Sequence, residues 1–421
     1  MYKIASRFLY VSLLAIACNN SDTNKNATVS KEAGPNDGAT ASADTTGQPV
    51  ETKSPNSSYK PAFAGQTRIG GVTTRTPYEA TVLSTELDKP WGIVQLPDGR
   101  FLITQKSGKF RIASGDGKLS EPITGLPEVN PRGQGGLLGL RIDPAFDKNR
   151  MIYWVFSESV QGGTHTSVAK GKLSADEKKI ENAKVIYRAT PAYDGTLHYG
   201  GRILIDKQGN LVISTGERSD LATRPQAQWL NSGLGKVIRI TTDGKPASGN
   251  PFVGKSDARP ELYSYGHRNV QGLAWHPQTG DLWECEFGPR GGDELNRIQP
   301  GKNYGWPIIT YGIEYSGEQV PGGITQKEGM EQPVYYWDPV VSPSGMVFYD
   351  GNAIPEWKNN LFIAALNTPH LLRLVIENNK VTGEERLLVK EKERFRDVTV
   401  GKDGALYAIT DGGKLYKVAK K

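Results

Sequence analysis

The chain has 421 residues, with 51 Lys and Arg against 45 Asp and Glu, 49 glycines and two cysteines. Two cysteines form one bridge at most, which excludes a disulfide-built scaffold, and the net charge of +6 is too evenly spread to indicate a nucleic-acid partner. The glycine content lies well above the roughly 7% average, which favours a turn-rich β protein over a helical one.

The first residues resemble a secretory signal. Lys3 and Arg7 form a charged region, and the apolar stretch from Phe8 to Ala17 is too short to span a membrane. Small residues then lead to Cys18, as in a bacterial lipoprotein signal, although Leu14 lies one place early. We therefore expect a signal peptide over residues 1–17, a lipid anchor at Cys18, and an exported protein that is periplasmic or membrane-anchored. An ordinary cleaved signal with an incidental cysteine is the alternative.

Polar and small residues dominate the segment that follows, from position 19 to about 60. Such a segment cannot bury enough apolar surface to fold. The composition predicts a disordered tether over residues 18–74, with the lipid-bearing cysteine at its start. The globular domain is expected over residues 75–421.

One pattern recurs six times in the globular part: two short β runs with alternating apolar residues, joined by a Pro, Asp or Gly turn. The copies begin at Trp91, Gly136, Gly200, Gln271, Ser344 and Arg396. Their spacing suits one four-stranded blade each, which predicts an all-β, six-bladed β-propeller with long inserted loops and no long helix. Six independent hairpins in a sandwich are the alternative. Propeller loops converge on the central channel, so we expect the chemistry beside these hairpins.

Several chemistry-bearing residues lie there. His198 opens the third hairpin and could act as a base near neutral pH. Arg268 and Asn269 together suit a carboxylate or quinone oxygen, and the 288–294 turn offers carbonyls and carboxylates for Ca²⁺. Arg394 and Arg396 point the same way on an extended segment, which suits an anionic ligand. Each also has a structural explanation: a satisfied histidine, a packed loop, a solvated acidic turn or a charged strand edge.

Four longer motifs are typical of one family. They are His198-Tyr-Gly-Gly-Arg, Tyr265-Gly-His-Arg-Asn-Val-Gln-Gly, Glu286-Phe-Gly-Pro-Arg-Gly-Gly-Asp-Glu-Leu-Asn, and Gly301-Lys-Asn-Tyr-Gly-Trp-Pro. Over residues 87–418 the chain resembles the soluble pyrroloquinoline quinone (PQQ)-dependent aldose sugar dehydrogenases of the glucose/sorbosone dehydrogenase family. The resemblance implies a six-bladed propeller that uses PQQ and Ca²⁺ to oxidise aldoses to lactones. It also implies electron transfer to an external acceptor, a small quinone or a cytochrome.

The resemblance also implies roles for individual positions. His198 corresponds to the general base, and Arg268 to the residue that stabilises charge on the quinone oxygen. The positions that correspond to cofactor contacts are Gln134, Arg268, Asn269, Gln271, Tyr315, Ala365, Leu366, Asn367, Arg394, Phe395 and Arg396. Gly288 and Pro289 correspond to backbone ligands of the cofactor-bridging calcium, and Glu294 and Tyr304 to a second, structural calcium position.

The chain departs from the family at two places, because Asn367 replaces the usual Lys and Phe287 replaces a frequent His. Glu217 and Arg218 lie where the family varies with the sugar, so the substrate stays open. Two alternative functions remain: a metal-dependent propeller lactonase, which needs several acidic or amide groups around the channel, and a non-catalytic propeller that binds glycan or protein. Neither should bind a quinone.

Overall fold

A computed structural model describes residues 47–421. The expected signal peptide over residues 1–17 and the lipid anchor at Cys18 lie outside the described residues. Within the described range, no helix combines the length and apolarity needed to cross a lipid bilayer.

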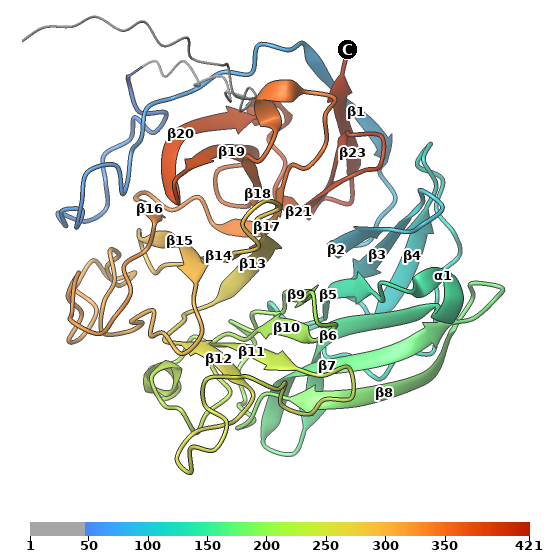
Figure 1. The fold of residues 1–421 in the computed structure, drawn as a ribbon, viewed down its shortest axis with the longest axis horizontal. Coiled ribbons are helices and arrows are strands. Elements are labelled where there is room, and N and C mark those ends of the chain that lie inside the picture. Colours follow the sequence, from blue (N-terminus) through green and yellow to red (C-terminus); the bar gives the residue numbers. More distant parts are fainter. Residues whose placement is uncertain (1–46) are drawn as a thin grey trace, which may run out of the picture. The chain divides into compact units, whose positions relative to one another are not determined.

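The strands of residues 47–421 form six antiparallel sheets arranged in a ring, which confirms the predicted all-β propeller (Figure 1). The first three blades consist of β2 (Pro90–Gln95), β3 (Phe101–Gln105) and β4 (Lys109–Ala113); β5 (Leu137–Ile142), β6 (Met151–Val160), β7 (Gly163–Leu173) and β8 (Ile180–Arg188); and β9 (Ile203–Ile205), β10 (Leu211–Ser214), β11 (Lys236–Ile240) and β12 (Leu262–Tyr265). The last three consist of β13 (Val270–Trp275), β14 (Leu282–Glu286), β15 (Asp293–Ile298) and β16 (Tyr335–Trp337); β17 (Pro343–Phe348), β18 (Leu361–Ala365), β19 (His370–Glu377) and β20 (Lys380–Leu387); and β21 (Phe395–Val400), β22 (Leu406–Thr410), β23 (Leu415–Lys420) and β1 (Tyr78–Ser84).

The first and last blades differ from a uniform four-stranded repeat. The first blade has three strands, so the prediction of four strands in every blade is wrong there; two isolated bridges, Phe110 to Ile123 and Ala113 to Leu119, extend it instead. The sixth blade takes its outer strand from the start of the domain, because β1 pairs with β23. This pairing joins the two ends of the domain and closes the ring, in which β21 contacts β2.

Helical structure in the described residues is limited to single turns. They are α1 (Phe146–Asn149) and the 3₁₀ turns η1 (Arg224–Ala227), η2 (Pro355–Trp357) and η3 (Val389–Glu391). The core therefore consists of apolar side chains between neighbouring blades.

Strand β14 shows how this packing produces chemistry. Side chains alternate between the two faces of a strand, so Trp283 and Cys285 enter the core shared by the fourth and fifth blades. Leu282 lies on the opposite face and packs with residues of the third blade. By the same alternation Glu284 and Glu286 share the face of Leu282, and both are buried. One face of this blade therefore changes from apolar to acidic along its length.

The predicted tether is wrong for residues 47–74, which lie along the outer edges of the fourth and fifth blades (Figure 1). Gln66 is fully buried. Its side-chain amide donates to the carbonyl of Pro333, and its backbone carbonyl accepts from the backbone N–H of Tyr336. Val72 bonds the backbone of Glu384 in β20. The segment lacks a core of its own, as its composition indicates, but hydrogen bonds to a preformed surface order it. We call residues 47–74 the N-terminal strap.

Candidate active site

His198 lies in the loop before β9, with a backbone φ of +46° that non-glycine residues rarely adopt. Its backbone N–H donates to Oε1 of Gln134 at 2.8 Å. Its ring Nδ1 lies 2.7 Å from Oε1 of Glu217, and both side chains are almost fully buried. The structure thus brings together His198 and Gln134, two of the predicted site residues, and adds Glu217, which the family resemblance places only at a position that varies with the sugar.

The Glu217 contact determines which ring nitrogen of His198 is available for chemistry. A carboxylate accepts hydrogen bonds, so it holds the proton on Nδ1 and leaves the lone pair on Nε2. Burial, followed by the positive charge of Arg268, lowers the pKa of His198 to about 4. The imidazole is therefore neutral at physiological pH, which is the state a base requires.

Arg218 fixes the loop that carries His198. Its guanidinium donates to the carbonyls of Leu197, Thr164 and Gly195 and to the Thr164 hydroxyl, at 2.5–3.0 Å. It also stacks 3.9 Å from the ring centre of Tyr199. Arg218 is 2% exposed, so it supports the base from within the protein.

Arg268 lies beside the predicted calcium loop. Its Nη1 donates to the carbonyls of Gly288 at 2.7 Å and Phe287 at 3.2 Å, while its buried Nε has no hydrogen-bond partner. Its guanidinium lies 5.2 Å from the ring centre of Trp306. Glu286 accepts from the backbone N–H groups of Arg268 and Asn269, which holds this loop in place.

Asn269 and Gln271 converge on the backbone next to His198. Oδ1 of Asn269 accepts from the N–H of Gly200, and Nε2 of Gln271 donates to the carbonyl of Gly200. Nδ2 of Asn269 is buried without a partner. The structure therefore brings Asn269 and Gln271 to the His198 loop, and it leaves two unsatisfied nitrogen atoms there, this one and Nε of Arg268.

The Gly288–Gly292 loop is built from its backbone. Oδ1 of Asp293 accepts from the N–H of Gly288, and Oδ2 accepts from the N–H groups of Val341 and Ser342. Burial raises the pKa of Asp293 to about 7. Asp293 thus holds the loop in place and does not present a free carboxylate. The groups of the loop that remain available to a cation are its backbone carbonyls.

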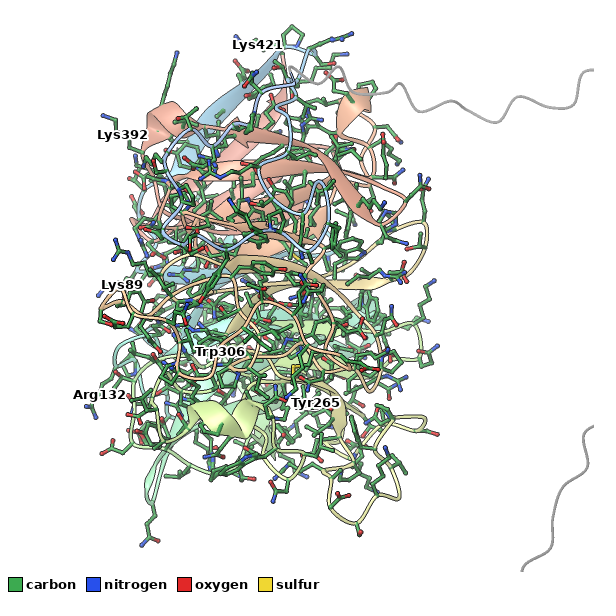
Figure 2. The ribbon with its side chains drawn as sticks, turned by 90° about the vertical axis from the view of Figure 1, so that its left-hand side faces the viewer. Lys89, Arg132, Tyr265, Trp306, Lys392 and Lys421 are labelled. Atoms are coloured by element: carbon green, nitrogen blue, oxygen red, sulfur yellow. The ribbon has the colours of Figure 1, made fainter. Side chains whose placement is uncertain are left out.

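A basic group forms another side of the site. Arg394 and Arg396 both bond the carboxylate of Asp411, and Arg394 also donates to the carbonyl of Leu366 at 2.9 Å. Burial, and then the nearby positive charge of Arg396, lower the pKa of Lys106. Sequence reasoning missed Lys106, whose Nζ bonds the carbonyl of Gly133 next to Gln134. Lys89 and Arg132 lie on one side of the propeller, at the left edge of the view in Figure 2.

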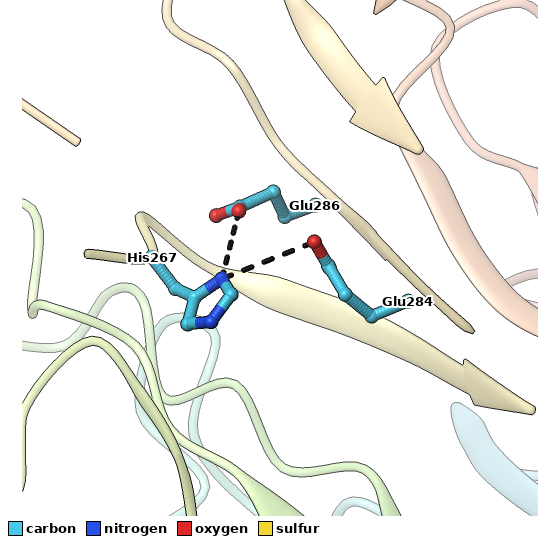
Figure 3. A group of neighbouring side chains, drawn as sticks. All are labelled: His267, Glu284 and Glu286. Carbon is cyan, nitrogen blue, oxygen red and sulfur yellow. Dashed lines mark hydrogen bonds and ion pairs between the residues drawn. The ribbon is translucent and has the colours of Figure 1, made fainter. Parts of the chain in front are cut away.

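A buried acidic group, which we call the acidic cluster, lies behind Arg268. It consists of Glu284, Glu286, Glu294 and Asn296 from β14 and β15, together with His267. Nδ1 of His267 lies 3.0 Å from Glu286 and 3.9 Å from Glu284 (Figure 3). Oε2 of Glu284 and Oδ1 of Asn296 are buried without partners. Burial, and then repulsion from Glu286, raise the pKa values of Glu284 and Glu294 well above normal. This arrangement fits a hard cation.

The remaining predicted residues take varied positions. Tyr315 is 71% exposed, and its loop is tied to η1 by the Glu314–Arg224 ion pair. Asn367 bonds the carbonyl of Val340. The side chains of Ala365, Leu366 and Phe395 are buried, so a ligand there would meet their backbone. The hydroxyl of Tyr304 bonds the carbonyl of Arg297, which leaves the backbone of Tyr304 for a cation.

Comparison with known proteins matches nearly all of this domain. Residues 87–417 match a family described as Glucose / Sorbosone dehydrogenase. Aldose sugar dehydrogenase YliI of Escherichia coli is 42% identical over 347 residues, 81% of this chain and 92% of that protein. The apo-form structure of the soluble E. coli aldose sugar dehydrogenase is 41% identical, with a TM-score of 0.79 over 82% of this chain and all of that one. The PQQ-bound aldose sugar dehydrogenase of Streptomyces coelicolor is 28% identical, with a TM-score of 0.68 over 82% and 99% of the two chains.

Proposed function

Because this chain belongs to the glucose/sorbosone dehydrogenase family, we propose that it oxidises aldose sugars at the anomeric carbon to lactones, with PQQ and Ca²⁺. The observation that carries the proposal is the convergence of His198, Glu217 and Arg268 beside the Gly288 carbonyl. A neutral, oriented imidazole next to a guanidinium provides a base and a positive charge at one point, which deprotonation of a sugar hydroxyl requires.

The site fits PQQ, an ortho-quinone with three carboxylates. The unpartnered Nδ2 of Asn269 and Nε of Arg268 are donors suited to quinone oxygens. Arg394, Arg396 and Lys106 supply positive charge for carboxylates, and Lys106 offers the charge that Asn367 lacks. When bound, PQQ supplies the ortho-quinone that accepts the anomeric hydride and later releases electrons to an external acceptor.

Nε2 of His198 takes the proton of the anomeric hydroxyl. Glu217 stabilises the resulting imidazolium through Nδ1, and Gln134 and Arg218 hold the backbone of the loop. Arg268 stabilises negative charge that develops next to it. The Leu197 and Tyr315 side chains, both exposed, are available to contact the sugar.

The residues present also fit two calcium ions. The carbonyls of Gly288 and Pro289 would hold the first, since a carbonyl that accepts from Arg268 keeps a second lone pair. The acidic cluster would hold the second, with Glu294 and the backbone of Tyr304 among its ligands and the unpartnered oxygens of Glu284 and Asn296 turned to the ion. There, calcium supplies positive charge that offsets three buried carboxylates.

Reconstitution tests the proposal. The protein, purified metal-free and then supplied with PQQ and Ca²⁺, is expected to reduce an artificial dye in the presence of aldoses and to form the lactone. A titration of PQQ should show the absorption change of the bound quinone. Lactone hydrolysis without PQQ would favour the lactonase alternative, and sugar binding without a quinone spectrum would favour the non-catalytic one.

The Glu217→Gln variant tests the role of the Nδ1 contact. Glutamine keeps the shape but lacks the charge that stabilises the imidazolium, and we expect kcat to fall by roughly ten- to a hundred-fold, no more than a general base itself contributes. Steady-state dye assays over pH measure this. The wild-type rate should decline only as pH falls toward about 4, where His198 becomes protonated. An unchanged kcat in the variant contradicts the role of Glu217.

A further inference from the structure

The N-terminal strap reaches the predicted calcium loop from behind. Asn56 donates to Oδ1 of Asp338 through its backbone N–H at 2.8 Å and its side chain at 3.0 Å. Ser57 donates to Oδ2 through its backbone N–H at 3.0 Å and its hydroxyl at 2.9 Å. Asp338 is 4% exposed, so these four donors from two strap residues satisfy a buried carboxylate. We call Asn56, Ser57 and Asp338 the strap latch.

The latch touches the loop directly at Gly291 and Arg290, and indirectly through Tyr311. A Cβ added to Gly291 would lie 2.7 Å from Oδ1 of Asp338, which shows how closely this carboxylate abuts the loop. Nε of Arg290 donates to Oδ1 of Asn56 at 3.3 Å. The hydroxyl of Ser57 also lies 3.1 Å from the carbonyl of Tyr311, and Tyr311 precedes Gly312, whose Cα region packs on Gly291.

The strap lies N-terminal to the part of the chain that the family match covers, which begins at residue 87. Asn56 and Asp338 are 282 positions apart in sequence, so the latch joins the start of the described chain to the segment after β16. A buried carboxylate that loses its donors is costly, which makes the latch a specific support rather than an incidental surface contact.

We propose that Asn56 and Ser57 are positioning residues for the Gly288–Gly292 loop, and that the latch strengthens the binding of calcium and PQQ at that loop. The proposal rests on the proposed function for the identity of the ligands. Residues behind the ligands of a metal orient them, and their loss typically weakens metal affinity. Here the ligands are backbone carbonyls, so their orientation depends on the support of the loop.

The test compares Asn56→Ala/Ser57→Ala and the milder Ser57→Ala with Thr74→Val, all in the full chain. Thr74→Val is a matched control, because its hydroxyl bonds Glu385 and Trp357, away from the loop. Hydrogen exchange of the metal-free protein should show faster exchange of the Arg290 and Gly292 amides in the latch variants only; these amides bond the carbonyls of Ile313 and Trp337. Calorimetry should show calcium affinity weakened by about ten-fold, with kcat at saturating PQQ and calcium unchanged.

Exchange rates and calcium affinities equal to those of Thr74→Val would overturn the proposal. If the unmutated chain binds neither calcium nor PQQ, the proposed function fails. The exchange experiment then still decides whether the latch holds the loop, because it uses the metal-free protein. Should the double variant not fold, Ser57→Ala alone decides between the two outcomes.

Discussion

Replacing His198 with alanine is expected to lower the rate of aldose oxidation by about 10²- to 10⁴-fold, the range that a general base contributes. The physical reason is the geometry at Nε2: Glu217 occupies Nδ1, burial keeps the ring neutral, and Arg268 lies beside it. Binding of PQQ should persist, because the backbone N–H of residue 198, not its ring, bonds Gln134. Dye-coupled kinetics and a PQQ absorbance titration measure the two effects separately.

His276→Gln is the matched control for this variant. His276 is also largely buried, but it follows β13 at the end of the strand opposite to Val270, which lies next to the site. It bonds the backbone of its own turn, so its loss should leave kcat unchanged. Near wild-type activity in the His198→Ala variant would contradict the assigned base.

Removing the calcium ion that we propose for the acidic cluster is expected to lower the apparent stability by about 2.7 kcal/mol at a calcium concentration of 100 times Kd. The cause is the acidic cluster, in which three buried carboxylates share one face of a blade. Glu284→Gln should reverse the order of stability of the variant and the wild type between the calcium-free and the calcium-bound condition. Without calcium the variant should be at least as stable as the wild type, because it cannot take on the repelling charge that Glu284 acquires as pH rises through its raised pKa. With calcium it should be less stable. Thermal unfolding with calcium and with a chelator measures both.

The pH dependence follows from the raised pKa values of Glu284 and Glu294. A group whose pKa is higher in the folded state binds protons preferentially there, so the metal-free protein should lose stability as pH rises above the normal glutamate value through the raised one. Calcium competes with these protons, so its stabilising effect should grow over the same range.

Glu384→Gln provides the control for the calcium experiment. Glu384 is a buried carboxylate in β20, where it bonds Arg386, Tyr335 and Trp337. Its loss should change stability equally with and without calcium. An equal calcium response in wild type and Glu284→Gln would contradict a cation site in the acidic cluster.

Lys106, Glu217 and Glu284 show why parts of the site could not be predicted. Lys106 belongs to the first blade and Arg396 to the sixth, and only the closed ring brings them together. Glu217 lies 19 positions after His198, across a complete hairpin. Glu284 and Glu286 left a readable signal, two acidic residues at alternating positions of a buried strand, but their partner His267 comes from another loop.

The sequence by itself determined the propeller, and its motifs located the loops in which we propose the base and the calcium ligands. Blade hairpins are local, with partners a few residues apart, so period-two alternation and turn residues suffice to identify them. His198, Arg268 and the Gly288–Gly292 loop lie in continuous motifs at the ends of those hairpins.

Only the tertiary structure decided the course of the N-terminal strap and the surroundings of the site. Composition reports whether a segment can bury its own apolar surface. It does not report whether an existing surface offers partners, such as the Asp338 carboxylate, to polar residues like Asn56 and Ser57. The three-stranded first blade, the acidic cluster and the neutral state of His198 likewise arise from contacts between segments far apart in the chain, because burial and charge act through space.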